Sequence, residues 1–198
     1  MQKLIAPLFV MFLLVTATPA SAQFLTDEEL LNALREGGLV MVMRHASSPA
    51  DPPDAATANP DNSNRERQLD AAGRAGAMAM GEALRRLGIP FAEVLSSPAY
   101  RTVETARYLG FTEIGFADFL GNQAMAASSD SVASALRQNL VLPTGTGNRL
   151  LITHSPNVAA AFPDLDPPIA QGEVLVFDPG SGQARRLGRI RIEQWVNF

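Results

Sequence analysis

The chain has 198 residues, with 16 basic and 20 acidic residues, a formal net charge of −4 and no cysteine. It is long enough for one domain with a proper hydrophobic core, and it cannot be a small fold stapled by disulfides. The mild acidity and the lack of a basic run argue against nucleic acid or an anionic membrane surface as a partner.

The first 22 residues have the pattern of a secretory signal peptide. Lys3 supplies a positive charge, residues 4–15 are almost wholly apolar, and Ala20-Ser21-Ala22 is a small-residue cleavage site. The apolar stretch is shorter than the roughly 20 residues of a membrane span, although a retained anchor is the alternative. We therefore expect cleavage after Ala22, a mature single domain over residues 23–198, a periplasmic or secreted location, and no stable membrane anchor.

Helices and buried strands alternate along the mature chain. A capping box at Thr26 opens a helix that ends at Gly37-Gly38, and Asp70 caps a second helix that continues to Leu87. Between these helices lies a short apolar strand, followed by a proline-rich loop over residues 46–65 whose length is typical of a functional or a disordered segment. Pro98 is expected just inside the start of the third helix. The further predicted elements are strands at 39–43, 94–96, 149–153, 174–177 and 187–192, and helices at 99–109 and 131–140; residues 111–127 receive no assignment.

Strands that alternate with helices predict an α/β domain built in layers around one sheet. The apolar runs suit parallel strands that are covered on both faces. The last two strands are joined by the turn at residues 179–182 and should be antiparallel, so the sheet is expected to be mostly parallel but mixed.

The only two histidines each follow an apolar strand. His45 comes after Arg44 at the end of strand 39–43, and His154 comes at the end of strand 149–153. Arg101 lies in the first turn of the helix that follows strand 94–96. Ligands of open α/β sheets bind at the carboxyl ends of the strands, so we expect these four side chains to form one anion-binding pocket.

Two arginines and two imidazoles are suited to phosphoryl transfer, which requires positioning and charge stabilisation. His45 is the candidate nucleophile because Arg44 beside it could hold the phosphate, and His154 would then act as a protonated donor. With no cysteine and two histidines, the chain offers no zinc site. Gly145-Thr146-Gly147 lacks the lysine of a P-loop, so we expect neither a metal nor a cofactor.

Four blocks in order resemble the histidine phosphatase superfamily, which has the phosphoglycerate-mutase-like fold. They are Arg44-His45-Ala46, Leu69-Asp70-Ala71-Ala72-Gly73-Arg74-Ala75-Gly76-Ala77, Ser96-Ser97-Pro98-Ala99-Tyr100-Arg101-Thr102-Val103-Glu104-Thr105-Ala106 and Thr153-His154-Ser155-Pro156-Asn157. The resemblance, to the exported bacterial branch in particular, implies a three-layer α/β/α sandwich and a metal-independent reaction. It also implies a phosphohistidine intermediate on His45, with Arg44, Arg101 and His154 holding the phosphoryl group.

The resemblance implies several alternatives for the proton donor, because Ser155 stands where the acid phosphatase branch of this family has aspartate. Glu113 and Asp118 lie in the segment where the mutase branch has glutamate, and Glu173 precedes the fourth strand; we favour Glu173. Ala46 also replaces the usual glycine.

Two further residues are candidates for substrate binding. Arg67 resembles an arginine near the pocket of similar exported members, with a solvated loop position as the alternative. Asn157 either donates to phosphate or caps the helix after His154.

The sequence thus predicts an exported phosphomonoester hydrolase that acts on a small phosphorylated substrate, for which an envelope sugar phosphate is one candidate. The alternatives are a phosphomutase and a binding module of the same fold that captures phosphate esters without turnover. The physiological substrate and the oligomeric state are not indicated by the sequence.

Overall fold

The fold is taken from a computed structural model that describes residues 24–54, 56–121, 129–180 and 182–198. The expected signal peptide therefore lies outside the described residues. None of the helices in these four ranges is long and apolar enough to cross a membrane.

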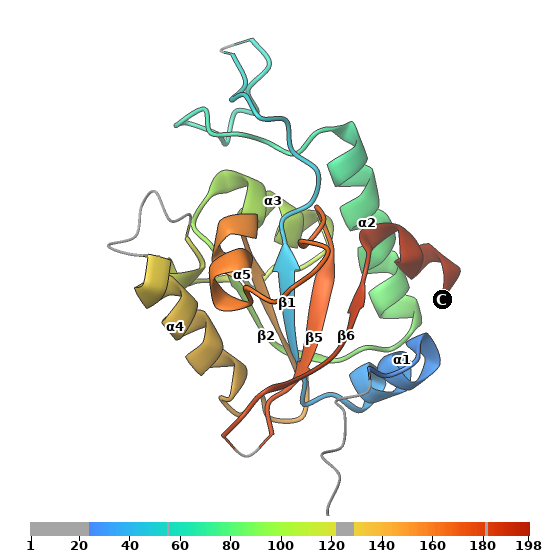
Figure 1. Cartoon of the computed structure of the whole chain (residues 1–198). Helices are drawn as coiled ribbons and strands as arrows, with labels where there is room; N and C mark the ends of the chain where they lie inside the picture. Colours follow the sequence, from blue (N-terminus) through green and yellow to red (C-terminus); the bar gives the residue numbers. More distant parts are fainter. Residues whose placement is uncertain (1–23, 55, 122–128, 181) are drawn as a thin grey trace, which may run out of the picture.

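A six-stranded mixed sheet forms the centre of the molecule (Figure 1), with the strand order β3-β2-β4-β1-β5-β6. β1, β2, β3 and β4 run parallel to one another, whereas β5 is antiparallel to both β1 and β6. The strands are β1 (Val40–Arg44), β2 (Phe91–Ser96), β3 (Gly115–Phe116), β4 (Asn148–Thr153), β5 (Val174–Asp178) and β6 (Arg185–Ile190).

Helices cover both faces of this sheet, which confirms the predicted α/β architecture. On one face lie α1, α2, α3 and the terminal 3₁₀ segment, and on the other lie α4, α5 and η1 (Figure 1). The helical segments are α1 (Asp27–Glu36), α2 (Ala71–Arg86), α3 (Tyr100–Tyr108), η1 (Asp118–Leu120), α4 (Ser129–Leu140), α5 (Ser155–Ala161) and η3 (Ile192–Asn197).

Strand β1 shows why the sequence folds into three layers. Its residues alternate between the two cores: Met41 and Met43 belong to the first, and Val40 and Val42 to the second. All four side chains are fully buried, so both faces of the strand must be apolar. This is why the strand is an unbroken run of apolar residues in the sequence.

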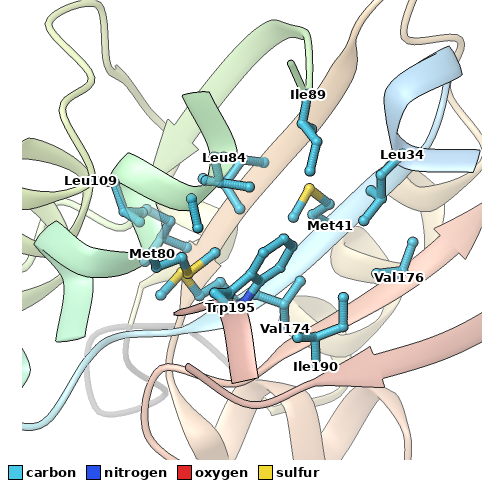
Figure 2. Packing of buried hydrophobic residues seen from close by; sticks show 14 of the residues in the cluster. Leu34, Met41, Met80, Leu84, Ile89, Leu109, Val174, Val176, Ile190 and Trp195 are labelled. Carbon is cyan, nitrogen blue, oxygen red and sulfur yellow. The ribbon is translucent and has the colours of Figure 1, made fainter. Parts of the chain in front are cut away.

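The larger core lies between the sheet and the helices α1, α2 and α3. Trp195, from η3, is fully buried there beside Met80, Val174 and Ile190 (Figure 2). The η3 segment thus packs into the same core as the first strand.

The predicted helix caps are confirmed. Thr26 and Glu29 form the capping box of α1, and the Asp70 side chain accepts a hydrogen bond from the Gly73 N–H at the start of α2. Pro98 is a difference: it precedes the N-cap residue Ala99 and so lies outside α3. The segment without a sequence assignment contains the two-residue strand β3 and η1, both too short to produce a periodic pattern.

Candidate active site

The carboxyl ends of β1, β4 and β2 lie side by side and bring the predicted site residues together. Arg44 pairs with Thr153 in the parallel ladder, so His45 and His154 follow neighbouring strands at the same level. Their ring centroids are 5.5 Å apart. Both imidazoles are buried, at 4% and 2% exposure. The two histidines therefore form one site, as the strand-end pattern predicts.

The His45 imidazole is held as a neutral base with a free Nε2. Its Nδ1 lies 2.8 Å from the Ala46 carbonyl oxygen, which can only accept, so Nδ1 carries the proton. The Ala46 N–H in turn donates to Thr105 Oγ1 on α3 at 3.1 Å. Burial, together with the charges of Arg101 and Arg44, lowers the pKa of His45 to about 4. The Nε2 lone pair is thus available at neutral pH.

His154 has the opposite proton arrangement. Arg101 Nη2 donates to its Nδ1 at 3.0 Å, so the proton is on Nε2, which donates to Ser97 Oγ at 2.9 Å. Burial, with Arg101 next in importance, lowers the pKa of His154 to about 2. In this arrangement His154 is neutral, which differs from the expected cationic donor, because burial and the neighbouring cations disfavour its charged form.

Arg44 and Arg101 keep unused donors in the site. Arg44 Nη1 donates to the Ile169 carbonyl at 3.0 Å, and Arg101 is engaged with His154 as described. The Nε atoms of both arginines are buried without a hydrogen-bond partner. Buried, unpaired guanidinium N–H groups are costly, and an anion with several acceptor oxygens satisfies them.

Arg67 joins this cluster of positive charge. Its guanidinium donates to the carbonyl oxygens of Pro49 and Ser48 at 2.5 and 3.1 Å, which ties the two sides of the long loop together. After burial, its charge is among the causes that lower the pKa of Arg44 and of Arg101. Arg67 therefore lies near the site, as the family resemblance implies.

Glu173 lies next to the site through its backbone, but its carboxylate is occupied elsewhere. Its carbonyl oxygen accepts from the Arg44 N–H at 3.1 Å. The carboxylate is buried at 1% exposure and is paired with Arg189 Nε and Nη2 at 2.6 and 2.7 Å. Burial raises the pKa of Glu173, but the hydrogen bonds from Arg189 and from the Ala170 N–H outweigh it and keep the pKa below its usual value.

Of the other candidates, Asn157 is buried next to β4, whereas Glu113 and Asp118 are at the surface. Asn157 is fully buried, and its amide donates to the carbonyl oxygens of Leu120 and Gly121 and to Thr153 Oγ1. It thus holds the η1 segment against β4, and His154 rather than Asn157 is the N-cap residue of α5. Glu113 and Asp118 are both exposed, and Glu113 precedes the amino end of β3.

Two residues without a predicted role complete the site. Ser97 orients His154, and Thr105 supports Ala46 as described above. Both residues belong to the sequence block around Arg101 that resembles the family motif, so that block could have pointed to them. Their partners, Ala46 and His154, are far away in the sequence and become apparent only in the folded structure. Within the described residues, no group of three or more His, Asp or Glu side chains is placed to hold a metal ion.

The sequence pattern of the histidine phosphatase superfamily (branch 1) matches residues 40–118. This range includes Arg44, His45 and Arg101, and with them three of the four sequence blocks that carry the expected resemblance; the block around His154 lies outside it. The chain has the histidine phosphatase fold, with a mixed central sheet between helices. No curated protein matches the chain in sequence.

Solved structures share the fold at low sequence identity. The protein histidine phosphatase SixA complexed with tungstate is 19% identical, with a TM-score of 0.54, over 79% of this chain and 98% of that one. Phosphoserine phosphatase from Entamoeba histolytica, in complex with 3-phosphoglyceric acid, is 13% identical, with a TM-score of 0.55, over 80% and 98%. Mycobacterial glucosyl-3-phosphoglycerate phosphatase is 17% identical, with a TM-score of 0.54, over 76% and 97%.

Proposed function

We propose that the protein is a phosphomonoester hydrolase that works through a phosphohistidine on His45 and without a metal. The observation that carries this proposal is the state of His45: a neutral imidazole with its Nδ1 proton on the Ala46 carbonyl and its Nε2 free. The unpaired Nε groups of Arg44 and Arg101 beside it supply donors for the phosphoryl oxygens. The phosphatases among the structural neighbours support the same reaction class.

The reaction proceeds in two displacements at phosphorus. In the first, His45 Nε2 attacks the phosphorus atom, the bond to the ester oxygen breaks, and the leaving oxygen takes a proton from solvent water to depart as the alcohol. In the second, water attacks the phosphohistidine, the P–N bond breaks, and inorganic phosphate and neutral His45 are released. The hydrogen bond from Nδ1 to Ala46 keeps the ring oriented in both steps and stabilises the charge that forms on it.

Substrate binding changes the charge of His154. The site is strongly cationic, and that charge, together with burial, is what keeps His154 neutral. A bound phosphoryl dianion makes the local potential less positive and attracts the Arg101 guanidinium away from His154 Nδ1. That nitrogen is then free to take up a proton, and His154 becomes the cationic donor that stabilises the transferred group. Glu173 was the expected general acid, but Arg189 engages both of its carboxylate oxygens. We assign it a structural role instead, in which its backbone carbonyl oxygen accepts from the Arg44 N–H.

Trapping of the covalent intermediate tests this proposal. Incubation of the wild-type protein with a ³²P-labelled aryl phosphate, followed by alkaline quenching, should leave an acid-labile, base-stable label on His45. The His45→Ala variant should lose the label and at least about 10³-fold of kcat/KM, because it lacks the proposed nucleophile. The His154→Ala variant should still become labelled, and its label should decay more slowly.

Three outcomes would contradict parts of this proposal. Full activity in His45→Ala would eliminate the nucleophile. Tight binding of phosphate esters without turnover across a broad panel would favour the binding module, and return of the phosphoryl group to the same substrate, without release of inorganic phosphate, would favour the mutase.

We also propose that the protein is exported and acts on a small phosphorylated substrate of the cell envelope. The pattern of residues 1–22 supports export, and the named substrates of the neighbours, such as phosphoserine, are small phosphate esters. Expression in a bacterial host should yield a periplasmic protein whose first residue is Gln23, as measured by N-terminal sequencing. A cytoplasmic protein that retains Met1 would contradict export, and a panel of phosphorylated sugars and amino acids tests the substrate class.

A further inference from the structure

Helix α3 carries Arg101 into the site, but its own first residues do not cap it. The N-cap residue Ala99 offers no side-chain hydrogen bond to the helix start. The cap comes from Glu66, which is 34 residues earlier in the chain: its Oε2 accepts from the Tyr100 N–H at 2.9 Å. A carboxylate at a helix N-terminus satisfies an otherwise unpaired donor and opposes the positive end of the helix dipole. Arg101 is the next residue after Tyr100, so the contact lies one residue from the phosphoryl site.

The segment before α2 holds Glu66 rigidly in place. Asn62, buried at 5% exposure, accepts from the Glu66 N–H at 2.8 Å and donates to the Glu66 carbonyl oxygen at 2.5 Å. Arg65 has a φ of 50°, and it is the only residue other than glycine with a positive φ among the described residues. A left-handed conformation at such a residue is strained, and the two hydrogen bonds between Asn62 and Glu66 hold the segment in it.

The charge of Glu66 also acts on Arg101. Burial lowers the pKa of the Arg101 guanidinium, Arg67 lowers it further, and the carboxylate of Glu66 raises it. Glu66 thus stabilises the charged state of a guanidinium that is surrounded by other cations. The carboxylates favoured by sequence, Glu173 among them, have no such relation to Arg101.

We propose that Glu66 is a positioning residue for Arg101: it caps α3 at Tyr100 and thereby fixes the direction in which the Arg101 side chain enters the site. The proposal rests on the proposed function insofar as Arg101 binds the phosphoryl group. It gives different roles to two neighbouring residues that follow the long loop: Arg67 belongs to the cationic cluster, and Glu66 holds the helix that brings Arg101 into that cluster.

The test compares Glu66→Ala, which removes both acceptor and charge, with Glu66→Gln, which keeps an acceptor oxygen. Glu93→Ala is the matched control, because Glu93 is a carboxylate paired with Arg149 at the amino end of β2, away from the site. The measurements are kcat and KM with para-nitrophenyl phosphate and with an alkyl phosphate, the affinity for orthovanadate, and Tm.

Glu66→Ala should lower kcat/KM about tenfold or more and weaken vanadate binding by a similar factor, because a misplaced Arg101 affects both. Glu66→Gln should stay within about threefold of the wild type, and Glu93→Ala should be unchanged. A fall in Tm for Glu66→Ala with unchanged kinetics and unchanged vanadate affinity would overturn the proposal.

Equal defects in Glu66→Ala and Glu66→Gln, confined to the alkyl phosphate and without loss of vanadate affinity, would also overturn it, because that pattern belongs to a proton donor. If the wild type hydrolyses neither ester, the proposed function fails. The vanadate affinities of the same variants then still decide the role of Glu66.

Discussion

At the scale of single residues, the two histidines of the site differ in which ring nitrogen carries the proton, because their hydrogen-bond partners differ. A carbonyl acceptor puts the His45 proton on Nδ1, and an arginine donor puts the His154 proton on Nε2. The two rings have the same chemistry and similar burial, so their unequal roles come from one contact each. Residue type alone cannot distinguish them.

The burial of the two rings in a cationic site can be tested for each ring separately, because the chain contains only two histidines. In a proton NMR titration of the folded protein, the His45 ring signals should titrate with a midpoint near 4, because burial lowers its pKa from 6.5 to about 4. The His154 signals should remain those of a neutral ring down to still lower pH. Saturating inorganic phosphate should raise both midpoints, because an anion favours the imidazolium form.

The single variants His45→Gln and His154→Gln assign the signals. Two midpoints near 6.5, unaffected by phosphate, would show that neither ring lies in the buried cationic site described here.

At the scale of elements, α3 is the part of the fold that connects the two sides of the site. Thr105 supports Ala46 after β1, and Glu104, buried at 4% exposure, accepts from the Leu69 N–H at 3.0 Å ahead of α2. The start of the same helix is capped by Glu66. A nine-residue helix with a basic site residue therefore owes its placement to three contacts from distant segments.

Helix α2 approaches the segment after His45 closely at Gly73 but not at Gly76. We therefore expect a glycine-to-alanine substitution to change the stability of the domain differently at these two positions. A Cβ atom on Gly73 would lie 2.1 Å from the Ser47 carbonyl oxygen, a backbone contact that cannot yield without a shift of the chain. A Cβ atom on Gly76, one turn later, would meet only the flexible end of Ile192 at 3.2 Å. Gly73→Ala should therefore destabilise the domain by about 2 kcal/mol or more and lower activity, because Ser47 lies two residues from His45.

Gly76→Ala is the control in the same helix. It should be neutral or stabilising by up to about 1 kcal/mol, because alanine is the better helix former. Urea unfolding followed by the fluorescence of Trp195, the only tryptophan and a fully buried one, measures both changes. Equal effects of the two substitutions would contradict the packing described at Gly73.

At the scale of the whole molecule, a neutral imidazole pair is held inside a cationic pocket, and stability should depend on pH accordingly. The unfolded chain protonates each histidine near pH 6.5, whereas the folded chain protonates His45 only near 4 and His154 lower still. Between these values the unfolded state binds more protons, so the free energy of unfolding falls as the pH falls through 6.5 toward 4.

The loss between pH 7 and pH 5 should be on the order of 1–2 kcal/mol for each histidine. Urea unfolding at the two pH values measures it in the wild type and in His154→Gln, which should lose about half of the pH dependence. Added phosphate should reduce the loss, because it binds only the folded state. A free energy of unfolding that does not change over this pH range would contradict the neutral, buried state of both rings.

The sequence by itself determined the layered architecture and the place of the chemistry. Apolar runs such as residues 39–43 can be buried only inside a sheet covered on both faces, and the parallel strands bring Arg44, His45 and His154 to one edge. Helix caps such as Asp70 are local hydrogen bonds between residues close in the chain, which is why they were predictable.

The tertiary structure alone decided which atoms face one another across that edge. It paired Glu173 with Arg189, turned Asn157 toward η1, and put Glu66 at the start of α3, all through contacts between residues far apart in the chain. It also set the charge state of the two histidines, because desolvation and the sum of nearby charges depend on the packed surroundings of a side chain and not on its neighbours in sequence.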